Sequence, residues 1–233
     1  MCKFEEINKR YNTEYTNRLY KNKNIFYELN EKTNDKYLCG SYLIDGTCYE
    51  YSDKMYEKQE LLYNSVKNEE TVLEIGSYMG HSLLIMLLSN PNLKITCVDI
   101  DDNYTKPCTD ILNKYFNNQI TFIHGNSINV IEELINKKEK FDFFHIDASH
   151  ENSIVTKEFN GVLQLNKNIH YMKVIFDDWL CMEKLSKEIL KKYKIINDVI
   201  PVCGWSNRLL IINLVKFKTF NPFYFFLFDN YLF

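Results

Sequence analysis

The stretch TVLEIGSYMGHS, residues 71–82, decides the fold of this chain. Its apolar run ends in Glu74, and Gly76 and Gly80 then bracket a turn before a helical pattern begins at Leu83. A strand, a tight loop and a helix N-terminus in that order form the usual ligand site of an open α/β sheet. Both glycines allow a positive φ and a close backbone approach. We therefore expect this loop to bind a nucleoside-type ligand.

The spacing of the glycines narrows the class of ligand. The pattern Gly76-x-x-x-Gly80 lacks the central glycine of the Gly-x-Gly-x-x-Gly sites that hold a dinucleotide pyrophosphate, and Tyr78 fills that space. The next apolar run, residues 95–98, is followed by Asp99, whose carboxylate can accept hydrogen bonds from both hydroxyls of a ribose. The pattern favours a ligand with an adenosine and no pyrophosphate.

Apolar runs of strand length alternate with helical patterns from Val72 onward, which is typical of βαβ units and a parallel sheet. We expect strands at 71–75, 94–99, 120–124, 141–147, 173–177, 194–200 and 207–214. We expect helices at 81–89, 105–117, 127–138, 151–165 and 180–193, with Pro107 in a first helical turn. Because no helical pattern separates the last two strands, they should form an antiparallel hairpin at the sheet edge.

The run Glu74-x-Gly76-x-x-x-Gly80 and the following Asp99 resemble class I S-adenosylmethionine-dependent methyltransferases, whose first motif reads Glu-x-Gly-x-x-x-Gly. The most similar members are metal-dependent O-methyltransferases of the catechol type and relatives that act on sugars and antibiotics. The resemblance implies an α/β, Rossmann-like sheet of seven mostly parallel strands in the order 3-2-1-4-5-7-6, with an antiparallel last strand and helices on both faces. It also implies that S-adenosylmethionine is bound by Glu74, Gly76, Ser77, Tyr78, Gly80, Ser82, Asp99, Ile100, Asn126, Ser127 and Asp147. Two alternatives stay open, since Ser127 fits a plain N-cap equally well and His81 could replace Ser82.

Three aspartates follow strands that come later in the chain. Asp147 lies in the string HIDASH, and Asp177 and Asp178 lie in IFDDW. Their carboxylates should converge at one edge of a parallel sheet, where they repel one another unless a cation is present. Oxygen ligands suit Mg²⁺, or else Mn²⁺ or Ca²⁺, and the resembled metal-dependent enzymes hold their metal at the matching positions. The alternative is that Asp177 or Asp178 caps the following helix.

A metal at these aspartates would bind the acceptor hydroxyl, lower its pKa and aim its oxygen at the methyl group. We expect Asp147 and His150 to be the catalytic residues, with His150 taking the hydroxyl proton. The catechol family has a lysine where this chain has His150, and the sugar-modifying relatives have an aspartate at Ser149. An N-cap or surface role for His150 is the alternative. We expect His145 to be a hydrogen-bonded residue of the sheet.

Composition argues against several other classes of protein. The net charge of −3 gives no reason to expect a nucleic-acid partner. Seven cysteines without Cys-x-x-Cys spacing argue against disulfides and structural zinc and favour a reducing, cytoplasmic location. The N-terminus shows neither a signal peptide nor a membrane anchor. The aromatic tail is too short to span a bilayer, and we expect it to pack on the sheet or on a second copy in a homo-oligomer.

We divide the chain into an N-terminal helical or irregular cover of the acceptor site (1–52), a methyltransferase domain (53–216) and an aromatic tail (217–233). The predicted function is Mg²⁺-dependent O-methylation of a small polyhydroxylated molecule. A sugar or glycoside is placed ahead of a phenol, because the loop at 205–207 lacks the glutamate of the catechol-type enzymes. Two other functions stay open. One is an NAD(P)-dependent oxidoreductase, and the other is a binding or assembly protein that keeps the fold without the chemistry.

Overall fold

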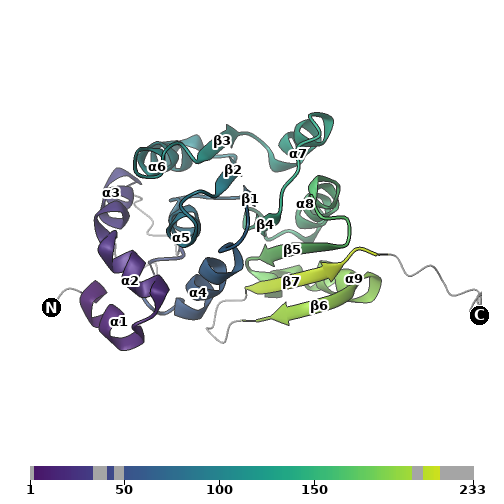
Figure 1. Ribbon diagram of the computed structural model, residues 1–233. Coiled ribbons are helices and arrows are strands. Elements are labelled where there is room, and N and C mark those ends of the chain that lie inside the picture. The colour runs from purple at the N-terminus through teal and green to yellow at the C-terminus, as the bar shows by residue number, and fades with distance from the viewer. Residues whose placement is uncertain (1–2, 34–40, 45–49, 201–206, 216–233) are drawn as a thin grey trace, which may run out of the picture.

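The computed structural model describes residues 3–33, 41–44, 50–200 and 207–215. A seven-stranded sheet forms its centre, with helices on both faces (Figure 1). The strands are β1 (Thr71–Ile75), β2 (Lys94–Asp99), β3 (Ile120–His124), β4 (Phe143–Ile146), β5 (Tyr171–Phe176), β6 (Lys194–Val199) and β7 (Arg208–Asn213). Their order is β3-β2-β1-β4-β5-β7-β6, which confirms the predicted fold class.

Strands β1 to β5 run parallel, and β7 pairs antiparallel with both β5 and β6. The predicted hairpin at the sheet edge is therefore confirmed, although its connection at 201–206 lies outside the described residues. The strand order changes direction at β1, since β2 and β3 lie on one side of it and β4 and β5 on the other. Ligands of open α/β sheets bind at such a switch point, beyond the carboxyl ends of the strands.

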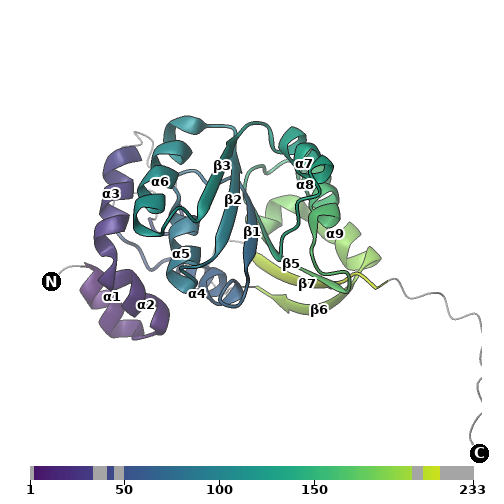
Figure 2. The ribbon, with the colours of Figure 1, turned by 45° about the horizontal axis from the view of Figure 1, so that its top comes forward.

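Two groups of helices sandwich the sheet (Figure 2). One face carries α4 (Tyr56–Ser65), α5 (His81–Ser89) and α6 (Asp102–Tyr115), and the other carries α7 (Ser127–Asn136), α8 (Asn152–Leu165) and α9 (Glu183–Lys192). A 3-10 turn at Trp179–Met182 precedes α9. Every residue of α5 is buried, which fits its nearly uninterrupted apolar sequence HSLLIMLLS. Such a helix needs partners on the side away from the sheet as well.

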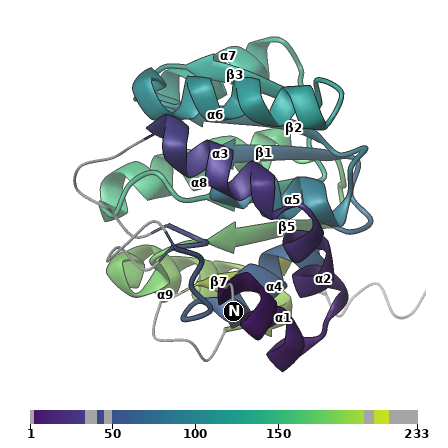
Figure 3. The same ribbon diagram turned by 90° about the vertical axis from the view of Figure 1, so that its left-hand side faces the viewer.

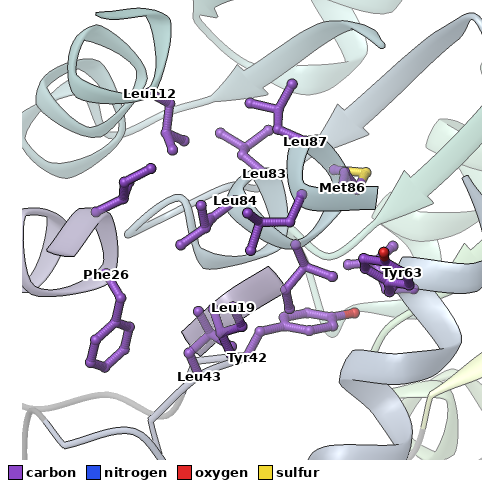
Figure 4. Packing of buried hydrophobic residues seen from close by; sticks show 14 of the residues in the cluster. Leu19, Phe26, Tyr42, Leu43, Tyr63, Leu83, Leu84, Met86, Leu87 and Leu112 are labelled. Carbon is purple, nitrogen blue, oxygen red and sulfur yellow. The ribbon is translucent and has the colours of Figure 1, made fainter. Parts of the chain in front are cut away.

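The N-terminal helices supply those partners. They are α1 (Lys3–Tyr11), α2 (Glu14–Lys21) and α3 (Lys23–Thr33), and α3 lies along α5 and α6 (Figure 3). Leu19 and Phe26 from this layer belong to the same apolar cluster as Leu83, Leu84 and Leu112 (Figure 4). Burying one large apolar side chain stabilises a fold by about 1.5–3 kcal/mol. The N-terminal segment is thus an integral third layer on this face of the sheet.

Most predicted elements have the expected bounds to within three residues. Helix α6 begins earlier than predicted because the Asp101 carboxylate accepts a hydrogen bond from the Asn103 amide and caps it, which leaves Pro107 beyond the first turn. Helix α4 was not among the predicted helices, since its buried face carries Lys58 and Gln59 and its apolar spacing is irregular. The aromatic tail 217–233 lies outside the described residues, so its predicted role stays a prediction. None of the described helices is long and apolar enough to cross a membrane.

Candidate active site

A cavity of about 440 Å³ opens at the carboxyl ends of β1, β2, β4 and β5. Most of the predicted site residues line it, namely Gly76, Ser77, Tyr78, Ser82, Asp99, Ile100, Asn126, Ser127, Asp147, His150, Asp177 and Asp178. Glu74 and Gly80 do not line it. Among the described residues of the predicted cover 1–52, Ser41 and Tyr42 are the ones that reach the cavity. The strand order places the residues of β1 to β3 in one half of the cavity and those of β4 and β5 in the other.

The loop after β1 has its shape because of its glycines. Gly76 has a φ of +84°, and a Cβ built on it would lie 2.5 Å from the main-chain oxygen of Asp147. Gly80 has a φ of +72° at the start of α5, and its Cβ would lie 3.1 Å from Cβ of Cys108. Gly76 therefore lets the ends of β1 and β4 come together at the cavity floor, while Gly80 lets α5 pack against α6.

Asp99, the predicted ribose ligand, first of all organises this loop. Its Oδ2 accepts hydrogen bonds from the amides of Ser77 (2.9 Å) and Tyr78 (3.0 Å) and from the Thr105 hydroxyl (3.0 Å). Its Oδ1 accepts one bond, from the Asp101 amide at 3.0 Å. A carboxylate oxygen can accept more than one hydrogen bond, so Oδ1 keeps capacity for a ribose hydroxyl. The ribose assignment stays a prediction, made from a carboxylate that lines the cavity.

Glu74 is placed differently from the prediction. Its side chain is fully buried between strands, where Oε2 accepts a hydrogen bond from the Ser77 hydroxyl at 2.5 Å and Oε1 lies 2.7 Å from Nδ1 of His145. Glu74 and His145 are register partners in β1 and β4, so their side chains lie on the same face of the sheet. Glu74 thus holds Ser77 and does not itself line the cavity, and its predicted contact with the cofactor stays a prediction.

His145 connects this carboxylate to the other half of the cavity. Its Nε2 lies 2.8 Å from the Tyr42 hydroxyl, which also accepts a hydrogen bond from the Asn207 side-chain amide at 2.8 Å. Both ring nitrogens therefore have partners, which confirms that His145 is a hydrogen-bonded sheet residue. Burial and the nearby Asp177 raise the pKa of Tyr42 well above its ordinary value, so its hydroxyl stays protonated and can donate to His145.

Asp177 is bound by a lysine that the sequence did not single out. Lys58 on α4 places its Nζ 2.8 Å from Oδ1 and 2.5 Å from Oδ2 of Asp177, and both side chains are buried. Burial by itself raises the pKa of Asp177, but the Lys58 ammonium outweighs it, so that the pKa lies below its ordinary value. Loss of water and the adjacent Asp177 raise the pKa of Asp147 well above its ordinary value. Asp147 therefore has a more basic carboxylate than Asp177.

The side chain of Asp178, the third predicted metal ligand, lies against His150, the predicted base. Its Oδ2 lies 3.2 Å from Nδ1 of His150, and the residue has a left-handed φ of 48°. Burial and Asp177 raise the pKa of Asp178. The His150 side chain is 62% exposed, which leaves its other nitrogen accessible from the cavity that it lines. The structure thus gives His150 a carboxylate partner, an arrangement that fixes the orientation of an imidazole.

The acidic end of the cavity offers several possible ligand atoms for a divalent metal. Among the described residues, His145, Asp147 and Asp177 offer ligand atoms within 4.8 Å of one another, and Asp178 is not part of this group. Both nitrogens of His145 are engaged, however, and both oxygens of Asp177 contact Lys58. Mg²⁺ needs about six oxygen ligands in octahedral geometry. The residues in this arrangement do not fit a divalent ion.

The turn after β3 and residues of α7 and α8 line the far end of the cavity. Asn126 caps α7 by accepting a hydrogen bond from the Ile128 amide, and the Ser127 hydroxyl donates to Oε1 of Glu158 at 2.6 Å. Glu158 lines the cavity, burial raises its pKa, and its Oε2 has no hydrogen-bond partner. No motif in the sequence marks Glu158, which lies in the middle of α8 between Lys157 and Phe159. The N-cap alternative for this turn is borne out for Asn126 rather than for Ser127.

His81 and Ser82, the two candidates for the cofactor carboxylate, are separated by the structure. Ser82 lines the cavity, whereas the imidazole of His81 is fully buried and its Nε2 donates to Oδ1 of Asn30 at 2.8 Å. Burial lowers the pKa of His81 to about 3. His81 is thus a neutral core residue, and Ser82 remains the candidate ligand.

Comparison with known proteins agrees with this geometry. The model of an O-methyltransferase family matches residues 23–196. A caffeoyl-CoA O-methyltransferase of Medicago sativa is 35% identical over 91 residues, 36% of either chain. A caffeoyl-CoA O-methyltransferase-like protein of Arabidopsis thaliana is 27% identical over 122 residues, 48% of this chain and 53% of that protein. The chain thus spans about half, or less, of the length of these curated relatives.

Solved structures show the same fold. The O-methyltransferase of Bacillus cereus, solved in complex with SAH, superimposes with a TM-score of 0.60 at 14% identity, over 82% of this chain and 90% of that one. At this identity the likeness shows the fold, and the family model supports the resemblance to methyltransferases. Because the family model spans most of the chain, the assignment does not depend on the shorter matches. The chain belongs to the O-methyltransferase family.

Proposed function

We propose that this chain transfers a methyl group from S-adenosylmethionine to a hydroxyl of a small phenolic acceptor. The observation that carries the proposal is a single cavity whose one half is the loop of Gly76 to Tyr78 on Asp99 and whose other half holds Asp147 and His150. The first half suits an adenosine and the second suits a hydroxyl that must lose a proton. Family membership and the SAH of the Bacillus cereus protein support the same choice of cofactor.

The residues fit this cofactor. Gly76, which has no side chain to meet the main chain of Asp147 and Ala148, lets the loop lie against the end of β4, and Oδ1 of Asp99 can accept from a ribose hydroxyl. When bound, S-adenosylmethionine supplies a methyl group on a positively charged sulfur, and the acceptor oxygen takes the methyl while the electrons of the C–S bond return to sulfur. What the protein must add is position and a place for the hydroxyl proton.

Two residues can accept that proton. His150 lies at the rim with Asp178 at 3.2 Å, and Asp147 lies deeper, beside the main chain of Gly76. An imidazole held by a carboxylate can take a proton from the acceptor and later release it to solvent. The raised pKa of Asp147 makes its carboxylate a stronger base than an ordinary aspartate, so it can hold the hydroxyl before transfer. We assign proton removal to His150 and orientation of the hydroxyl to Asp147.

A phenolic acceptor is preferred over the sugar that the sequence favoured. The curated relatives carry the name caffeoyl-CoA O-methyltransferase, and caffeoyl groups present phenolic hydroxyls. A phenol has a pKa of about 10, so a histidine base can deprotonate it in the transition state far more readily than the alcohol of a sugar. The magnesium expected from the sequence stays a prediction that the donor set does not support.

The proposal is tested by mass spectrometry of the methylated product. The chain would be incubated with S-adenosylmethionine and a panel of caffeoyl-CoA, caffeate, simple catechols and glycosides. We expect S-adenosylhomocysteine to form in step with a methylated phenol, and His150→Ala to slow product formation by about a hundredfold or more. Methylation of glycosides with no phenolic turnover would overturn the acceptor class. A folded chain that neither binds nor consumes S-adenosylmethionine would favour the binding or assembly protein.

A further inference from the structure

Lys58 occupies the acceptor half of the cavity in a manner typical of a bound cation. Its ammonium touches both oxygens of Asp177, at 2.8 and 2.5 Å, and lies 4.1 Å from the centre of the Tyr42 ring. The side chain is only 7% exposed, and that of Asp177 is 4% exposed. A lysine is rarely buried to this extent unless its charge is paired. Lys58 is therefore fixed at the carboxyl ends of β4 and β5, where the three aspartates meet.

The surrounding hydrogen bonds hold Lys58 in this position. The Tyr42 ring that faces the ammonium is itself fixed by the bonds of its hydroxyl to His145 and Asn207, and His145 is fixed by Glu74. A cation over an aromatic face and against a carboxylate is stabilised from two sides. Moving Lys58 away would remove the ammonium that balances the buried charge of Asp177 and leave only the hydrogen bond from the Asp178 amide to Oδ1, which is costly. The ammonium is thus part of the fold as well as of the cavity.

A divalent ion and this ion pair exclude each other. The ion would need the oxygens of Asp177, which Lys58 already contacts, and Asp178 is turned toward His150. Replacing Lys58 by a dication would also expel a positive charge from a buried site. The ammonium instead balances the charge of Asp177. It has three N–H donors, and its contacts with the two Asp177 oxygens use at most two of them. The third can donate to an oxygen in the cavity that Lys58 lines.

We propose that Lys58 is the resident cation of this active site, and that it binds the acceptor oxygen in place of a divalent metal. That this oxygen belongs to a methyl acceptor rests on the proposed function, whereas the exclusion of a metal ion can be tested independently of methyl transfer. A positive charge beside the acceptor oxygen stabilises the negative charge that develops on it as its proton leaves. Lys58 thus does what the resemblance led us to expect from Mg²⁺.

The first experiment measures metal binding alone, by the electron paramagnetic resonance signal of free Mn²⁺ titrated into the full chain. Three variants accompany the wild type: Lys58→Met, Asp177→Asn, and Lys187→Met as the matched control, because Lys187 is 75% exposed and pairs with Glu183 on the outside of α9. We expect no Mn²⁺ site in the wild type or in Lys187→Met up to about 1 mM. Lys58→Met should gain one site per chain, since Asp147 and Asp177 are then free to act as ligands.

The proposal is overturned if the wild type binds one Mn²⁺ per chain and Asp177→Asn abolishes that site, because the ion would then displace Lys58. This comparison decides the question even if Lys58→Met fails to fold.

The second experiment measures methyl transfer with and without EDTA. We expect EDTA to leave the wild-type rate within about twofold, Lys58→Met to lower it by about a hundredfold, and Lys58→Arg to retain part of it. Full activity in Lys58→Met, or loss of wild-type activity in EDTA that Mg²⁺ restores, would contradict the proposal. Calorimetry of S-adenosylmethionine binding runs in parallel, so that a failure of the proposed function shows as absent cofactor binding, whereas a failure of the Lys58 proposal shows in the Mn²⁺ titration.

Discussion

Nδ1 of His145 lies 2.7 Å from Oε1 of Glu74, and neither side chain has measurable contact with solvent. The pair joins β1 to β4 directly beneath the loop of Ser77, whose hydroxyl binds the other oxygen of the same carboxylate. A hydrogen bond to a buried charged group contributes about 1.5–3 kcal/mol. The acidic residue of the first motif therefore acts inside the sheet, and its effect on the cofactor passes through Ser77.

Glu74→Gln should lower the free energy of unfolding by about 2 kcal/mol, because an uncharged amide replaces the carboxylate that receives two hydrogen bonds. Urea denaturation measures this. Glu70→Gln is the matched control, since Glu70 is 81% exposed in its ion pair with Lys167 and should change stability by no more than about 0.5 kcal/mol. Equal effects of the two substitutions would show that the Glu74–His145 pair contributes nothing to the fold.

Asp99→Asn should weaken S-adenosylmethionine binding by about tenfold or more. Oδ2 of Asp99 accepts hydrogen bonds from two amides and a hydroxyl, and Oδ1 accepts one from the Asp101 amide. In the variant an NH₂ group replaces one of these oxygens, so the bonds which that oxygen accepted are lost. Asp110→Asn is the control, because the Asp110 side chain is 56% exposed in its ion pair with Lys106 on α6 and does not line the cavity. Calorimetry on both variants checks the prediction, which is wrong if Asp99→Asn binds the cofactor like the wild type.

Gly76→Ala should abolish cofactor binding and destabilise the chain. The residue has a left-handed φ, and the new methyl would meet main-chain atoms of Asp147 and Ala148, which cannot move without shifting β4. A strained residue of this kind costs about 1–3 kcal/mol before any clash. Gly161→Ala serves for comparison, because its methyl would overlap Cγ2 of the Ile131 side chain, which can shift without moving the main chain, and the residue lies in a regular helix. Thermal unfolding and calorimetry should show the larger loss in Gly76→Ala.

His81 should make stability depend on pH. Burial lowers its pKa from 6.5 to about 3, so the unfolded chain binds a proton below pH 6.5 that the folded chain does not bind until about pH 3. The contribution of neutral His81 to stability is therefore fully present above pH 6.5. As the pH is lowered from 6.5 to about 3, the free energy of unfolding falls by about 1.4 kcal/mol per pH unit.

His81→Gln keeps a donor for Asn30 and removes the titration. Urea denaturation between pH 6.5 and 4.5 should then show a slope that is smaller than in the wild type by about one proton. Parallel slopes in the two proteins would mean that His81 is protonated in the folded chain.

The sequence was sufficient for the fold because its signals are local. Each strand is a short apolar run next to a turn, and the run ending at Glu74 with its two glycines determines where the ligand loop lies. The order of the strands came from resemblance, and TVLEIGSYMGHS carries that resemblance within twelve residues. Helix α4 escaped prediction because Lys58 and Gln59 are polar residues on its buried face, where an apolar stripe would have marked a helix.

The residues that line the acceptor half of the cavity could not be predicted from local sequence signals in the same way. Lys58 and Asp177 are 119 residues apart in the chain, and nothing near either residue indicates the other. Three aspartates at strand ends predicted a metal ion, which stays a prediction, and gave no sign of the Lys58 ammonium that the structure places against Asp177. Tyr42 likewise comes from a segment without clear periodicity, and its place beneath Lys58 depends on how α4 and β4 pack.

Binding of the methyl donor is tested most directly by calorimetric titration of S-adenosylmethionine into the wild-type chain in the presence of EDTA, with Asp110→Asn and Asp99→Asn measured beside it. We expect one site per chain whose affinity EDTA does not change, equal binding in Asp110→Asn, and weakened binding in Asp99→Asn. Absence of binding to the folded wild-type chain would contradict the proposed methyl transfer.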